Sequence, residues 1–173
     1  MADKTITQLT ATTSAASSDE FPLWVAGSAV TRKITKANLL SGYLVQSSGS
    51  WTPDLRFGGA AVGMTYSNRS GSYVKIGQLV IVSMTMTLSA KGSSTGAATI
   101  QGLPFAGVPL ATCAIRPFTL ASNVVSIIGI LAAGTAVMNI VGMTAAGVSM
   151  GSLTDTIFGN TTSLELSLAY ITS

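Results

Sequence analysis

The stretch that decides the fold runs from Gly71 to Phe105 and reads GSYVKIGQLVIVSMTMTLSAKGSSTGAATIQGLPF. In its first half, apolar side chains recur at every second position, which is the period of an extended strand with one buried face. A loop of small polar residues, 91–96, interrupts this pattern, and a second short strand from Ala97 to Ile100 precedes Pro104. The alternating apolar positions, which we predict to form a core strand or a subunit interface, are Val80, Val82, Met84, Met86 and Leu88.

Further strands are expected after this stretch, separated by turns of small residues. The spacing predicts them over Ala111 to Phe118, Val124 to Leu131, Ala136 to Val141 and Ser163 to Thr172. Short strands at roughly 8–12-residue spacing are typical of an all-β sandwich or barrel. We therefore predict an all-β protein whose residues 51–173 form an antiparallel, jelly-roll-like β-sandwich.

The N-terminal residues predict a small, extended segment that does not belong to this sandwich. Residues 1–20 are rich in Ser, Thr and Ala, and Phe21 to Val25 with Ala29 to Ile34 predict a hairpin followed by a short helix over Lys36 to Leu40. A hairpin and one or two helical turns are not stable alone in water, so the segment must dock on something. Residues 43–50, YLVQSSGS, are predicted to be a flexible linker.

The composition is unusually poor in charge for a protein that is dissolved as a monomer. Only 9% of the residues are charged, whereas 47% are hydrophobic. Surface charge keeps proteins soluble, so the chain either enters a membrane or buries much of its surface against other subunits. The net charge of +3 is too small to indicate nucleic-acid binding.

The residue types of most catalytic and metal sites are missing or isolated. The chain has no histidine, which removes the usual general base and the commonest metal ligand. Ser94 lies in a literal G-x-S-x-G match, but its context resembles a hairpin and it has no histidine to activate it. Cys113 lies in an apolar strand and is expected to be a core thiol. We predict no enzyme activity and no cofactor or metal.

Two groups of residues carry a resemblance to a known class of proteins. The first resembles a β-sandwich module of bacteriophage tail-fibre and other virion-appendage proteins, and it comprises Trp51-Thr52-Pro53, Tyr73-x-Lys75-Ile76-Gly77-x-Leu79-Val80, Lys91-Gly92-Ser93-x-Thr95-Gly96 and Ile100-x-Gly102-Leu103-Pro104-Phe105. The second comprises Ile6-Thr7-x-Leu9, Asp19-x-x-Pro22, Gly27 and Thr31-x-Lys33-Ile34-Thr35, and it is similar to the N-terminal virion-attachment segment of such proteins.

The resemblance implies an anchored trimer in a virion that is assembled in the cytoplasm of a bacterial host. Residues 1–42 would attach to a tail, portal-adaptor or capsid protein, and residues 51–173 would form a homotrimeric head that meets a host cell-surface receptor. The residues of the receptor-binding tip stay unassigned. The residues buried against the virion partner would be Ile6, Leu9, Trp24, Ile34 and Leu39.

Other interpretations stay open at the level of the sequence. The N-terminal segment could instead pack on its own domain or on a sister subunit, and the head could decorate a capsid as a head fibre or cement protein. In a third interpretation, of a different class, the uncharged run from Val124 to Gly142 is a membrane helix of a pore-type protein. Small and polar residues interrupt that run and its β-branched content suits strands, so we expect no membrane insertion.

Overall fold

The computed structural model of the chain describes residues 20–24, 31–35 and 46–173. The chain divides into two compact units, Met1–Val45 and Gln46–Ser173. The structure confirms an all-β protein: within the described residues, every element is a β-strand apart from the short 3-10 helix η2, Asp155–Ile157.

The first unit contains an antiparallel hairpin, which the sequence predicted. Its strands are β1, Glu20–Trp24, and β2, Thr31–Thr35, paired so that Glu20 lies opposite Thr35. An ion pair of 2.8 Å joins Lys33 Nζ to Glu20 Oε2 beside this end of the hairpin. The predicted helix over Lys36 to Leu40 lies outside the described residues.

The second unit is built from ten strands that form one continuous antiparallel sheet. In sheet order the path is β3-β5-β6-β12-β8-β9-β10-β7-β4, with β11 added beside β10. The strands are β3 (Gln46–Trp51), β4 (Asp54–Phe57), β5 (Thr65–Ile76), β6 (Leu79–Ala90), β7 (Ala98–Gln101), β8 (Ala111–Phe118), β9 (Ser126–Leu131), β10 (Met138–Met143), β11 (Gly151–Ser152) and β12 (Ser163–Ile171).

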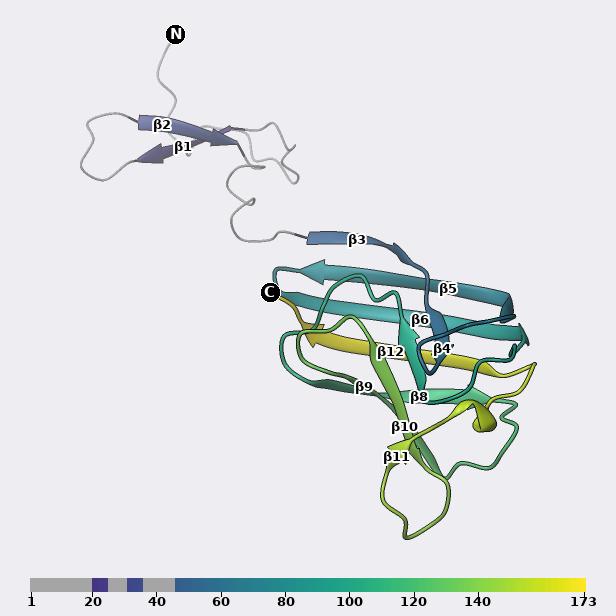
Figure 1. The fold of residues 1–173 in the computed structure, drawn as a ribbon. Helices are drawn as coiled ribbons and strands as arrows, with labels where there is room; N and C mark the ends of the chain where they lie inside the picture. The colour runs from purple at the N-terminus through teal and green to yellow at the C-terminus, as the bar shows by residue number, and fades with distance from the viewer. Residues whose placement is uncertain (1–19, 25–30, 36–45) are drawn as a thin grey trace. The chain divides into compact units, whose positions relative to one another are not determined.

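Strand β8 turns this sheet into two layers. Its second half, from Ile115 to Phe118, pairs with β12, whereas its first half, from Ala111 to Ala114, pairs with β9. The sheet curls at β8 into a half-barrel, in which β3, β5, β6 and β12 form one wall and β9, β10, β7 and β4 form the other (Figure 1). The strand order does not identify the arrangement as a jelly roll, which is the finer part of the prediction.

The two outermost strands, β3 and β4, are consecutive in the chain, so the chain itself crosses from one wall to the other. Only Thr52 and Pro53 separate them. At this crossing, Trp51 packs over Gly71 of β5, where a Cβ atom would lie 2.5 Å from the indole. Tyr73 of β5 lies in the same way over Gly49 of β3, where a Cβ atom would lie 2.9 Å from its ring.

The structure corrects the second half of the predicted linker. Residues 46–50 are not flexible spacer but the body of β3, paired with β5 from Gln46↔Ile76 to Ser50↔Ser72. These residues are exposed and small, so their sequence has no strand signal. The aromatic–glycine contacts described above supply the packing that their own side chains lack.

The hydrophobic core lies between the two walls and is formed by residues of the single chain. Inward side chains of β6 are 5% exposed or less. Those of the neighbouring strand β12, and those of β10 and β4 in the other wall, belong to the same core cluster. The structure therefore places Val80, Val82, Met84, Met86 and Leu88 in the core of the single chain.

We predict that the alternation along β10 is visible in the stability of single variants. Ile140 is fully buried and Asn139 beside it is exposed. Ile140→Ala leaves a cavity and should lower the free energy of unfolding by about 2–5 kcal/mol. Asn139→Ala should change it by less than about 0.5 kcal/mol. Chemical denaturation of both variants measures this, and equal losses would contradict the assignment of the faces.

Candidate functional site

The face of β5, β6 and β12 that points away from the core, which we call the outer face, is the candidate site. The strand pairing sets its side chains in rows across the three strands. One row contains Ile76, Leu79 and Ile171, and the next contains Val74, Ile81 and Ala169. Because residues directly opposite each other in antiparallel strands lie on one face, these six side chains form a contiguous surface.

Five of these six are large apolar side chains, and all five are exposed to solvent. We call them the apolar patch: Val74 (37% exposed), Ile76 (39%), Leu79 (39%), Ile81 (44%) and Ile171 (39%). Val108, which is 51% exposed, adjoins them because its backbone N–H donates to the carbonyl of Ile171. A contiguous patch of this kind marks a surface that another molecule covers, whereas single exposed apolar residues are ordinary.

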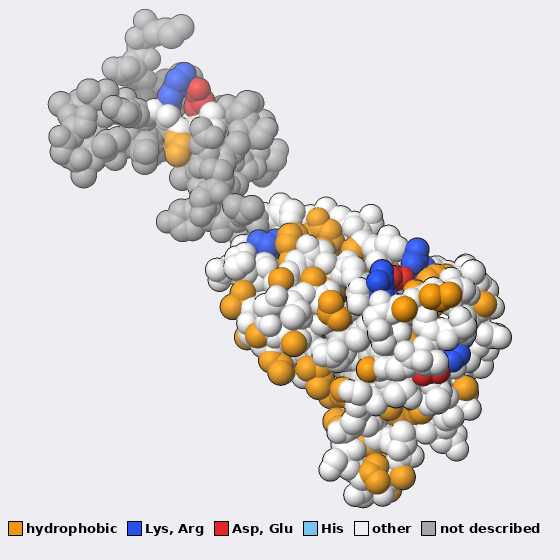
Figure 2. All heavy atoms as spheres, viewed as in Figure 1, with side chains coloured by type: hydrophobic (Ala, Val, Ile, Leu, Met, Phe, Trp, Pro, Cys, Tyr) orange, Lys and Arg blue, Asp and Glu red, His pale blue; other side chains and the backbone are white. Residues whose placement is uncertain are grey.

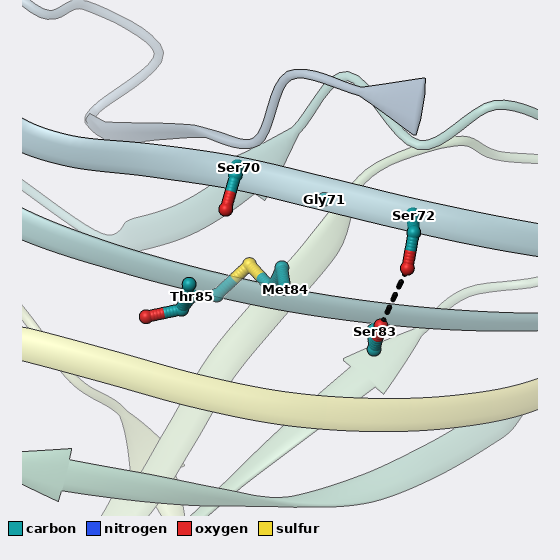
Figure 3. Close-up of a pocket in the computed structure, with 6 residues that line it drawn as sticks. All are labelled: Ser70, Gly71, Ser72, Ser83, Met84 and Thr85. Carbon is teal, nitrogen blue, oxygen red and sulfur yellow. Dashed lines mark hydrogen bonds between the residues drawn. The ribbon is translucent and has the colours of Figure 1, made fainter. Parts of the chain in front are cut away.

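Next to the apolar patch, the outer face becomes polar without becoming charged. The next row contains Ser72, Ser83 and Ser167. The hydroxyls of Ser72 and Ser83 are hydrogen-bonded at 2.9 Å (Figure 3). A shallow depression of about 240 Å³ lies here, and Figure 3 shows the residues that line it: Ser70, Gly71, Ser72, Ser83, Met84 and Thr85.

Beyond the serine row, one ion pair is the charged feature of the outer face among the described residues. Arg116 of β8 contacts Glu165 of β12 at 3.3 Å, and both side chains are largely exposed, at 70% and 44%. An exposed pair of this kind contributes about 0–1 kcal/mol to stability. Its importance here is that it leaves the outer face without net charge.

A second group of charges closes the free edge of β4. Asp54 contacts Arg56 at 2.7 Å and Arg69 at 3.1 Å. The hydroxyl of Tyr66 accepts a 3.0 Å hydrogen bond from the backbone N–H of Leu55, so it occupies the edge that another strand would need. Burial raises the pKa of Tyr66 above its ordinary value.

The third charged group, Lys91 and Asp155, holds a loop. Asp155 Oδ1 accepts a 2.9 Å hydrogen bond from the backbone N–H of Gly96, and Oδ2 contacts Lys91 Nζ at 3.1 Å. The Gly96 N–H and then the Lys91 ammonium hold the pKa of Asp155 below its ordinary value. These contacts fasten the 91–97 loop to η2 and are structural in character.

The two candidate nucleophiles of the sequence lie in structural surroundings. Ser94 is buried and its Oγ accepts a 2.8 Å hydrogen bond from the backbone N–H of Val62. Its context is not a hairpin, because β6 and β7 lie in different walls and do not pair. Cys113 is buried 3.8 Å from the sulfur of Met138, and burial raises the pKa of its thiol. Neither group has the activated chemistry of a nucleophile.

Most of the predicted virion-anchor residues lie outside the part of the chain that the structure describes. Ile6, Leu9 and Leu39 lie outside the described residues. Trp24 ends β1, and Ile34 is half-buried in β2. The prediction that these residues contact another protein therefore stays a prediction.

Sequence reasoning missed the apolar patch, although one part of its signal was visible. Ile81 falls on the parity that otherwise holds Ser83, Thr85 and Thr87 and is an apolar exception on a polar face. Its neighbours in the patch come from β5 and β12, and only the strand register brings them together.

No protein-family model matches this chain, and no curated protein matches its sequence. Within the described part of the chain, no helix is long and apolar enough to cross a membrane. The predicted alternative of a membrane helix over Val124 to Gly142 is wrong, because this segment forms β9 and most of β10. The described residues also hold no cluster of three or more metal-ligating side chains.

We predict a pH-dependent contribution from Asp155. Since its pKa is lower in the folded chain than the ordinary value of 3.8, its stabilising effect is present above that value and is lost as pH falls through the folded pKa. Asp155→Asn should therefore lower the melting temperature at neutral pH, and the difference from the wild type should shrink towards about pH 2. Thermal melts at both pH values measure this. A difference that stays constant with pH would assign the loss to packing instead of charge.

Proposed function

We propose that this chain is a non-enzymatic structural component of a tailed-phage virion. In this proposal, a homotrimer attaches to the particle through residues 1–42 and displays a β-sandwich head, residues 51–173, for adsorption to the host. The observation that carries the proposal is the apolar patch, a contiguous exposed apolar surface on a subunit whose own core is already complete.

The scarcity of free charge supports assembly. On the face of the second unit that Figure 2 shows, most side chains are uncharged, and Lys, Arg, Asp and Glu form a few small groups. The three carboxylates of residues 46–173, Asp54, Asp155 and Glu165, each contact a cation of the same subunit. Ion pairs that are satisfied internally do little to keep separate copies apart, whereas the patch favours association by the hydrophobic effect.

The first unit supports attachment for a different reason. An isolated two-stranded hairpin is marginally stable at best in water. The described part of this unit is the hairpin β1–β2 with one exposed ion pair, Lys33–Glu20. A partner surface would supply the apolar contacts that such a hairpin needs, which is the role that we assign to a tail, portal-adaptor or capsid protein.

The oligomer prediction can be tested with a matched pair of variants. Ile81 in the patch is 44% exposed, and Val148 in the loop before β11 is 45% exposed. Ile81→Glu buries an unpaired charge at the interface and should weaken association by about 2 kcal/mol or more. Val148→Glu should leave it unchanged. Light scattering after size-exclusion chromatography gives the mass of each variant, and circular dichroism verifies that both stay folded. Two variants with the same mass as the wild type would contradict the use of the patch.

A test of the proposed virion role requires intact phage particles. We expect that deleting residues 1–42 abolishes incorporation into particles while the remaining chain still associates. Electron microscopy of intact particles, with the chain tagged at its C-terminus, locates the full-length protein. Density on the tail supports a fibre, density over the capsid supports the decoration role, and a particle without the chain overturns the proposal.

A further inference from the structure

We infer that three copies of this chain meet through their outer faces, around a three-fold axis that runs along β6. The inference rests on the proposed trimer and adds which surface forms it and what lies at its centre. Each copy would present β5, β6 and β12 to the axis, with the wall that contains β9 and β10 on the outside.

The position of the patch in the sheet is the first reason. In the wall β3-β5-β6-β12-β8, strand β6 is the middle strand. The patch is centred on it, with Leu79 and Ile81 on β6 itself and the other members on the two flanking strands. Along the strands, the patch lies at the end of the wall where β5 turns into β6. An apolar sheet face of this kind is buried when walls pack face to face, as in sandwich packing. Among the other exposed apolar residues, Phe118 ends β8 in the same wall, whereas Val62, Val125 and Val148 lie in separate loops.

Charge is the second reason, and it favours identical copies as the occupant. Around the patch, the outer face carries the Arg116–Glu165 pair, which has no net charge. Identical surfaces of this kind approach without like-charge repulsion. The edge of β4 holds two arginines and one aspartate, and a self-contact there would bring like charges together.

The serine row gives the trimer a polar centre beside its apolar one. Ser72 and Ser83 follow the patch along β5 and β6, at the depression that Ser70 and Thr85 also line. Around a three-fold axis, the three depressions face one another and form a chamber with hydroxyl groups from each copy. Hydroxyls both donate and accept hydrogen bonds, so the chamber fits water or a small uncharged polar ligand, and it does not exist in the single subunit.

Spin labels on the full-length protein test this arrangement. One label replaces Ser83 as Ser83→Cys, on the outer face of β6, and the control label replaces the exposed Asn139 as Asn139→Cys, on the outer side of the other wall. The native Cys113 is buried, and an unmodified sample measures any label that it takes up. Pulsed dipolar spectroscopy then gives the distance between copies at each position.

We expect the distance at position 139 to exceed that at position 83 by about 15–20 Å. Stacked walls lie ~10 Å apart, and the three-fold geometry multiplies an outward shift of each label by about 1.7. If the label at Ser83→Cys dissociates the trimer while the Asn139→Cys trimer stays intact, this result also supports the outer face as the interface. A trimer with equal or reversed distances overturns the inference and leaves the virion role standing. A monomer overturns the inference, and particle imaging then decides the virion role separately.

Discussion

The structure depends on the strict alternation of side chains along β6, which serves two surfaces at once. Its inward side chains belong to the hydrophobic core of the chain, and its outward side chains are first Leu79 and Ile81 and then hydroxyl-bearing residues. Because the period of a strand is two, a shift of the register by one residue would exchange these surfaces. The long pairings of β6 with β5 and β12 hold that register, so the apolar patch is a consequence of the same pairing that builds the core.

The two walls of the half-barrel are connected at both sides, by strand β8 and by the chain crossing from β3 to β4. On one side, β8 belongs to both walls and carries the sheet around the bend. On the other side, the chain passes from β3 to β4, and the indole N–H of Trp51 donates to the carbonyls of Ser72 and Ser83, both at 3.2 Å. The reciprocal contacts of Trp51 with Gly71 and of Tyr73 with Gly49 explain why a strand of exposed small residues stays paired.

The sequence predicts strands well where one strand carries its own signal. Ala111–Phe118 was predicted with the bounds that β8 has, and β12 differs by one residue at its end. β5 and β4 were missed: the inward positions of β5 include Gly71 and Arg69, a bulge interrupts it near Tyr66, and β4 is short. The candidate site could not be predicted, because Ile76 and Ile171 become neighbours only through the pairing of both strands with β6.

The described part of the second unit has a packed core, and its three carboxylate side chains are ion-paired within the chain. The surface that still lacks a partner there is the apolar patch. We propose that copies of this chain cover that surface. Sedimentation equilibrium of the full-length protein without detergent measures the mass of the assembly. A homotrimer gives a particle of three times the 17.5 kDa chain mass. A stable, soluble species with the mass of one chain would contradict the proposal.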